Sequence, residues 1–89
     1  MKIVWHKNFE KHYKKRVLPY KNINLKYQER IRLFIKNQQD PVLKDHQLTG
    51  KMRLYRSFWI AGDIRVTYRI ENGVFNFYDV GSHNQVYRN

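Results

Sequence analysis

Four side chains in the second half of the chain are of types that can transfer protons or hold a phosphate: His46, Asp63, Arg65 and His83. Cleavage of RNA by its own 2′-hydroxyl needs a base for the hydroxyl proton, an acid for the leaving 5′-oxygen, and positive charge at the phosphate oxygens. Histidine suits both proton-transfer roles because its unperturbed pKa, about 6.5, lies near cellular pH. The planar fork of arginine matches phosphate oxygens. Phosphodiester cleavage is therefore a candidate activity.

Each of these residues also has an interpretation without catalysis. Histidines outside a recognised motif are commonly surface or turn residues, which is what we expect of His6 and His12. Asp63 ends the segment AGD and is a natural turn residue, and Arg65 is a natural solvated strand residue. The residue types alone leave these alternatives open.

A metal site built from His46, Asp63 and His83 is a further alternative. Their scattered positions match no HxH or HExxH spacing, so we expect no metal and no other cofactor. Trp59 and Tyr87 are ordinarily packing residues, although either ring can stack on a nucleobase.

The first 40 residues are predicted to form a strand and two helices that support these side chains. Residues 2–6, KIVWH, suit a short strand. Apolar residues recur every four positions from 9 to 17, which predicts an amphipathic helix that ends at Pro19. A second apolar stripe at helical spacing covers residues 27–35 and ends before Pro41, because the residue before a proline avoids the α region.

The remainder of the chain predicts three strands, at residues 52–60, 64–70 and 74–80. Apolar and polar residues alternate cleanly in the second of these, IRVTYRI. Asn72-Gly73 then predicts a tight hairpin, because Asn-Gly supplies the positive φ angles of a type I′ turn. The third strand is apolar on both faces and is expected to be central or covered. The predicted fold is α+β, with an N-terminal strand and a two-helix hairpin packed on an antiparallel sheet that ends in a three-stranded meander.

This topology predicts which of the reactive residues meet. In a meander the start of the middle strand lies beside the end of the last one, so Asp63 should lie near His83. Asp63 and Arg65 are two residues apart on one strand and share a face. The position of His46 is less constrained, since its loop can fold either way.

Charge is the most informative feature of the composition. The 89 residues, expected to form a single domain (1–89), contain 18 Lys and Arg against 7 Asp and Glu, a net charge of +11. A field of this strength attracts phosphate backbones or an acidic protein. A solubilising surface is the plain alternative, but solubility alone favours a smaller net charge. The basic residues assigned to the outer faces of the helices are Lys7, Lys11, Lys14, Lys15, Lys26, Arg30, Arg32 and Lys36.

Cysteine usage and hydropathy bear on location. The chain has no cysteine, which excludes disulfides and thiolate zinc sites and fits a reducing cytosol. No stretch approaches the ~20 apolar residues of a membrane span. We therefore expect a soluble, cytoplasmic protein without membrane contact.

Four motifs together resemble the RelE/ParE superfamily of toxins from type II toxin–antitoxin modules, and most closely its YafQ-like branch. They are DHxLxG at 45–50, YR at 55–56, GDIRVTY at 62–68 and GSHNQVY at 81–87. The motifs and the segments between them cover about half of the chain in the order of the family, and the N-terminal strand and helices fit the rest of a RelE-like fold. Each motif alone is weak, and the combination carries the resemblance.

The resemblance implies a ribosome-dependent mRNA endoribonuclease that cuts the codon in the ribosomal A site, without a metal, through attack by the 2′-hydroxyl. The active-site residues of the branch correspond to His46, Asp63 and His83, with Tyr87 as the C-terminal aromatic. Basic helix faces of the family contact ribosomal RNA.

The resemblance also implies a partner, a small antitoxin with an acidic tail that binds its own operator. Operator DNA would then be reached only through the antitoxin. On this chain the ribosomal RNA contacts would fall to the lysines of the first helix, Lys11, Lys14 and Lys15.

Two positions depart from the pattern of the branch. Trp59 stands where a histidine is frequent, and Asp79 stands where an arginine is frequent. Arg56 and Arg65 are the candidates for the missing positive charge at the phosphate. Trp59 is a further candidate for contact with the RNA.

Two other functions are weighed against the nuclease. A ParE-like toxin shares the fold but poisons DNA gyrase, and its action does not depend on histidines. A non-catalytic module would bind RNA or a protein through the basic helices. Both alternatives predict that His83→Ala leaves toxicity largely intact.

Overall fold

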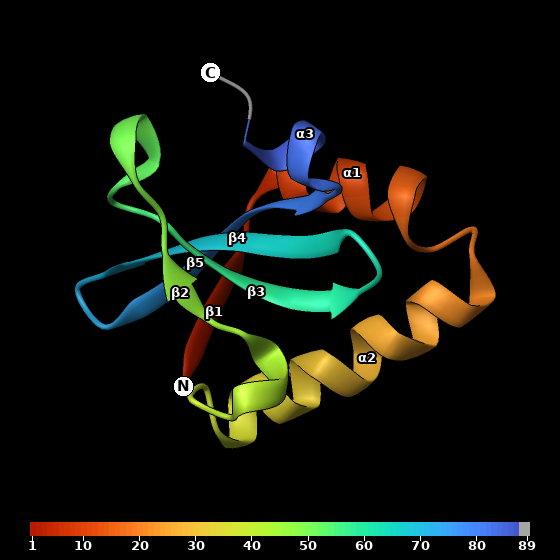
Figure 1. Cartoon of the computed structure of the whole chain (residues 1–89), viewed down its shortest axis with the longest axis horizontal. Helices are drawn as coiled ribbons and strands as arrows, with labels where there is room; N and C mark the ends of the chain where they lie inside the picture. The colour runs from red at the N-terminus through yellow and green to blue at the C-terminus, as the bar shows by residue number, and fades with distance from the viewer. Residues whose placement is uncertain (88–89) are drawn as a thin grey trace.

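The structure, a computed structural model, describes residues 1–87 (Figure 1). In chain order the elements are β1 (Lys2–Trp5), α1 (Lys7–Arg16), α2 (Lys21–Lys36), β2 (His46–Gln47), β3 (Arg56–Ala61), β4 (Ile64–Glu71), β5 (Val74–Gly81) and α3 (His83–Val86). Short 3₁₀ helices cover Pro41–Leu43 and Gly50–Met52. The predicted α+β fold with a C-terminal meander is confirmed. The first strand of the meander begins later than predicted, because Gly50–Met52 turns before β3 starts.

The five strands form one mixed sheet in the order β1-β5-β4-β3-β2. The hairpin between β4 and β5 has the predicted Asn-Gly geometry, with φ angles of 52° at Asn72 and 75° at Gly73. β5 is an interior strand, as its two apolar faces predicted, because it pairs with β4 on one side and β1 on the other. That pairing is parallel, whereas the sequence predicted an antiparallel sheet throughout.

The core lies between α2 and the sheet, and α2 crosses one face of the meander (Figure 1). Phe34 sits at its centre, with its ring 4.4 Å from Phe58 and 5.1 Å from Tyr68 between centroids. Such contacts between large rings account for much of the core of a small domain. One face of α2 differs from prediction: Ile35 is exposed, and Arg30 is buried in place of an apolar residue.

Helix α1 covers the edge of β5 that β1 leaves open. β1 stops at Trp5, paired with Phe77, and α1 starts two residues later and runs beside the rest of β5. No helix within residues 1–87 is long and apolar enough to span a bilayer.

Candidate active site

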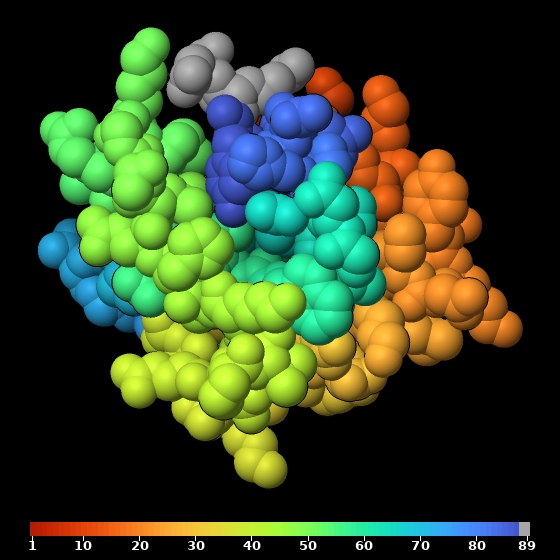
Figure 2. All heavy atoms as spheres, in the orientation of Figure 1, coloured from red at the N-terminus to blue at the C-terminus, as the bar shows by residue number. Residues whose placement is uncertain are grey.

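A cleft of about 340 Å³ separates the β2–β3 connection from α3. In Figure 2 it lies between the green segment of the β2–β3 connection and the blue α3. Three of the predicted catalytic residues, His46, His83 and Tyr87, are among its lining residues, which also include Gln47, Leu48, Thr49, Lys51 and Met52. The fold therefore brings together two histidines that are 37 positions apart.

The His46 ring is held by one hydrogen bond. Its Nδ1 lies 2.8 Å from the backbone carbonyl oxygen of Lys44, which can only accept. Nδ1 therefore carries the proton in this arrangement, and Nε2 of the neutral ring keeps its lone pair. Lys44 itself has φ of 51°, a left-handed turn that directs its carbonyl back toward the ring. His46 is exposed, so its Nε2 is accessible to a ligand.

The segment that carries His46 is anchored by the residue before it. The Asp45 carboxylate is 5% exposed and accepts hydrogen bonds from Arg56 Nε at 2.8 Å and from the Tyr68 hydroxyl. Gln38 completes the network with an amide hydrogen bond of 2.8 Å to the Tyr68 oxygen. Charge-assisted bonds of this kind, buried behind the loop, fix the position of His46.

Arg56 thus takes a different place from the one predicted. Burial acts to lower the pKa of its guanidinium, but hydrogen bonds to Tyr68 and Asp45 and their charge outweigh burial and leave the pKa raised. Its guanidinium is committed to Asp45, and Arg56 does not line the cleft. The geometry makes Arg56 a positioning residue for the loop of His46.

His83 is the first residue of α3, and the local sequence explains why a helix starts there. Ser82 accepts a hydrogen bond from the Gln85 backbone N–H at 3.3 Å, and the Gln85 side chain accepts one from the Ser82 N–H at 2.8 Å. This reciprocal capping box satisfies two backbone donors that the helix leaves free. Sequence reasoning placed His83 in a turn and missed this short helix, although S-x-x-Q is the signal for it.

Asp63 lies beside His83, as the meander topology predicted. Its Oδ2 accepts a hydrogen bond from the backbone N–H of His83 at 3.3 Å, so the carboxylate contacts the main chain and not the imidazole. Its Oδ1 pairs with Arg65 Nη2 at 2.6 Å. Asp63 therefore helps to place α3, and it links α3 to the arginine next to the cleft.

Tyr87 completes the wall of the cleft. Its hydroxyl donates to the buried Ser57 Oγ at 2.8 Å, and its ring meets the His83 ring edge-on with centroids 4.5 Å apart. The Arg65 guanidinium carbon lies 5.5 Å from the centroid of the Tyr87 ring, within cation–π range. One tyrosine thus contacts both His83 and the arginine that holds Asp63.

A second, smaller hollow of about 190 Å³ adjoins the cleft at His46, which lines both. Trp59, Lys44 and Arg65 also line this hollow. The Trp59 indole N–H donates to the Gly62 carbonyl at 2.9 Å. Two cations lie near the Trp59 ring, with Arg30 Cζ at 4.9 Å and Lys44 Nζ at 5.1 Å from its centroid. The sequence assigned Arg30 to the basic outer face, but its side chain is 9% exposed and faces Trp59.

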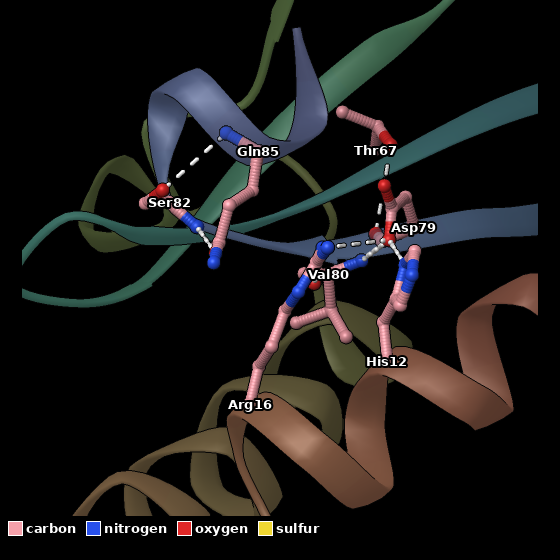
Figure 3. Close-up of polar contacts among 7 residues, drawn as sticks. All are labelled: His12, Arg16, Thr67, Asp79, Val80, Ser82 and Gln85. Carbon is pink, nitrogen blue, oxygen red and sulfur yellow. Dashed lines mark hydrogen bonds and ion pairs between the residues drawn. The ribbon is translucent and has the colours of Figure 1, made fainter. Parts of the chain in front are cut away.

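Asp79, the second departure from the YafQ-like pattern, does not line the cleft, and its carboxylate faces His12 and Arg16 of α1 (Figure 3). Its Oδ1 lies 2.6 Å from His12 Nδ1 and 3.4 Å from Arg16 Nη1, and it accepts from the Val80 N–H at 2.8 Å. Arg16 also donates to the Val80 carbonyl at 3.1 Å. Side chains thus satisfy the backbone of β5 where β1 no longer pairs with it. His12, expected at the surface, is part of this contact and is largely buried.

The three lysines predicted to contact RNA, Lys11, Lys14 and Lys15, are exposed on α1, and none of them lines the cleft. Within residues 1–87, no group of three His, Asp or Glu side chains is arranged to hold a metal ion.

Comparisons with known proteins relate the whole chain to bacterial toxins. Residues 1–88 match the profile of a family described as the bacterial toxin of type II toxin–antitoxin system, YafQ. A YafQ mutant from E. coli superposes with a TM-score of 0.79 at 24% identity, over 97% of both chains. The E. coli DinJ–YafQ complex contains a match with a TM-score of 0.76 at 25% identity, again over 97% of both chains. A metal-bound toxin from Helicobacter pylori gives 0.71 at 25% identity, over 98% of this chain and 99% of the other. No curated protein sequence matches.

Proposed function

Because this chain belongs to the YafQ family of toxins from type II toxin–antitoxin systems, we propose that it is an endoribonuclease that cleaves mRNA in the ribosomal A site. The single observation that carries this proposal is the pair His46 and His83, which line one cleft between two anchored elements. A base and an acid on opposite sides of a phosphate are what cleavage by a 2′-hydroxyl requires.

The hydrogen bond of His46 supports its assignment as the base. Its Nε2 removes the proton from the 2′-hydroxyl, and the oxygen attacks the adjacent phosphorus. The Nδ1–H bond to the Lys44 carbonyl persists as the ring becomes positive, and it strengthens because its donor is then charged.

His83 then takes the role of the acid. The bond from phosphorus to the 5′-oxygen breaks, His83 gives its proton to that oxygen, and a 2′,3′-cyclic phosphate remains on the upstream RNA. Tyr87 packs on the His83 ring and holds its orientation. Positive charge for the phosphate oxygens comes from Lys51, which lines the cleft, and from Arg65, which lines the adjoining hollow. Lys51 was not singled out from the sequence.

The partners follow from the charge and from the relatives. A net charge of +11 favours ribosomal RNA as the docking surface, with Lys11, Lys14 and Lys15 on the exposed face of α1. The E. coli relative forms a complex with DinJ. We infer an acidic antitoxin for this chain too, with operator DNA bound only through it.

Cleavage of mRNA on programmed ribosomes tests the proposal, with the 5′ ends of the products mapped by primer extension. The wild type should cut in the A-site codon, and His46→Ala or His83→Ala should each slow cleavage by about 10²- to 10⁴-fold. His6→Gln is the matched control, because His6 contacts Asn76 and Tyr78 and does not line the cleft. Thermal unfolding checks that each variant folds.

Three outcomes would contradict the proposal. Intact mRNA together with inhibition of DNA gyrase supercoiling would identify a ParE-like toxin. Ribosome binding without cleavage would identify a non-catalytic RNA-binding module. Full activity in a folded double variant of His46 and His83 would remove the histidines from the chemistry.

A further inference from the structure

The hollow beside Trp59 has the composition of a nucleotide-binding site. An indole ring forms one wall, and Lys44, His46 and Arg65 supply cationic or hydrogen-bonding groups around it. No carboxylate lines the hollow within the described chain, and Lys44 makes no ion pair among residues 1–87. Single-stranded nucleic acid is typically bound by an aromatic ring under the base and basic side chains along the backbone.

The Trp59 ring is held in place before any ligand binds. Its N–H bond to the Gly62 carbonyl fixes the orientation of the indole. Arg30, a buried residue of α2, packs against the ring. Its Nε is a buried donor without a partner in the described structure. A fixed ring costs less conformational entropy on binding than a mobile one, which favours its use as a stacking surface.

The order of the two hollows gives the bound RNA a direction. The base that activates the 2′-hydroxyl must contact the nucleotide on the 5′ side of the broken bond, and the acid must contact the oxygen on the 3′ side. His46 lines both hollows, whereas His83 lines only the larger cleft. The hollow of Trp59 therefore lies on the side of the catalytic base, His46, and away from the catalytic acid, His83.

We propose that Trp59 and Lys44 form the subsite for the nucleotide 5′ of the cleaved bond. Its base stacks on the indole in the place that the Lys44 ammonium takes in the free protein, 5.1 Å from the ring centroid, and that ammonium pairs with its phosphate. This inference rests on the proposed function, because the direction comes from the roles of His46 and His83. It makes Trp59 a determinant of base preference at that nucleotide and not at the next one.

A double-mutant cycle between protein and RNA tests the inference. Single-turnover cleavage on programmed ribosomes is measured for the wild type and Trp59→Ala, with an abasic site placed either 5′ or 3′ of the cleaved bond. With the 5′ abasic site, the second-order rate constant for single-turnover cleavage by the wild type should fall by about 10- to 100-fold, the range expected for one stacked base. Trp59→Ala should lower the same rate constant by a similar factor on intact RNA, and the 5′ abasic site should lower the rate constant of this variant little further. The 3′ abasic site should lower the rate constant of Trp59→Ala by the same factor as that of the wild type. Trp59→Phe should restore part of the activity.

Trp5→Phe is the matched aromatic control, because Trp5 packs on Phe9 and Phe77 and lines neither hollow. The same variant leaves Trp59 as the only tryptophan, since the chain has two. Its fluorescence should be quenched by an RNA with a 2′-deoxy sugar at the cleaved nucleotide, and less by the same RNA lacking the 5′ base.

The possible failures are distinguishable. If cleavage occurs but the effects of Trp59→Ala and the 5′ abasic site are additive, or if Trp59→Ala is coupled to the 3′ abasic site, the subsite is overturned. The nuclease proposal would still stand. Absence of cleavage by the wild type would overturn the proposed function. In that case the absence of quenching by the 2′-deoxy RNA would overturn the subsite as well.

Discussion

At the residue scale, hydrogen bonds assign roles that residue types leave open. Sequence alone does not distinguish His46 from His83, whereas in the structure His46 Nδ1 lies 2.8 Å from the Lys44 carbonyl oxygen. Asp63 was predicted to be catalytic and Arg56 to bind the phosphate. In the structure the Asp63 carboxylate contacts the backbone of α3, and the Arg56 guanidinium pairs with Asp45 beside His46. Both side chains therefore hold the elements that carry His46 and His83.

Tyr87 separates the effect of a ring from that of a hydroxyl. Tyr87→Phe keeps the contacts with His83 and Arg65 but loses the hydrogen bond to Ser57, which is buried. We expect a loss of about 1 kcal/mol in the free energy of unfolding and a cleavage rate within a few-fold of wild type. Tyr87→Ala should slow cleavage by about 10-fold or more, because the His83 ring loses its support.

Urea unfolding and single-turnover cleavage measure the two effects separately. If Tyr87→Phe were as slow as Tyr87→Ala while still folded, the hydroxyl itself would take part in the chemistry.

At the scale of elements, α3 depends on contacts made by β4, β5 and α1. Gly81 joins β5 to α3 at a crowded point, where an added Cβ would lie 2.6 Å from the Gln85 amide oxygen and 2.9 Å from Arg16 Nη1. The Arg16 side chain therefore packs over the turn that leads to His83. Asp79 holds Arg16 there and also caps the Val80 N–H.

Removal of Asp79 should destabilise this junction. Asp79→Ala removes the carboxylate that pairs with His12 and with the largely buried Arg16 and that accepts from the Val80 N–H. We therefore expect a loss of about 1–3 kcal/mol in the free energy of unfolding. Glu71→Gln is the control, because Glu71 forms a partly exposed pair with Arg69 at 3.7 Å and should change stability by about 0.5 kcal/mol or less.

Denaturant unfolding and amide hydrogen exchange at Val80 and Gly81 provide the measurements. Equal effects of the two substitutions would show that the contact of α1 with β5 does not stabilise the junction.

At the scale of the whole molecule, a small core supports a strongly charged surface. Rings from α1, α2, β1, β3, β4 and β5 meet around Phe34 and Phe77. Two tyrosines, Tyr27 and Tyr68, are included in this core. The core therefore responds to alkaline pH.

Stability should fall as pH rises above about 10. Burial raises the pKa of Tyr27 and of Tyr68 above the ordinary value of 10.0, and the Asp45 carboxylate raises that of Tyr68 further. The unfolded chain loses these protons near pH 10 while the folded chain keeps them, so their contribution to stability is full below pH 10 and declines above it. Each group adds a slope of about 1.4 kcal/mol per pH unit there.

Urea unfolding between pH 8 and 12 checks this, with Tyr68→Phe as the comparison. The variant lacks one of the two groups, so its decline above pH 10 should be shallower. Parallel curves for the variant and the wild type would show that the Tyr68 proton does not stabilise the fold.

The sequence by itself determined the features that depend on neighbours along the chain. Alternation placed the strand that became β4, Asn72-Gly73 set the hairpin, and hairpin geometry alone put Asp63 beside His83. The four motifs together indicated the family, which the match over residues 1–88 bears out.

Only the tertiary structure decided the features that depend on how distant elements dock. The parallel pairing of β1, the pairing of Arg56 with Asp45, and the burial of Arg30 against Trp59 all join residues that no local pattern relates. The same holds for His46, whose loop could have folded either way until Tyr68 and Arg56 fixed Asp45 beside it. Periodicity shows which face of an element is apolar, but the partner of a buried charge is set by packing, and here that packing builds the cleft.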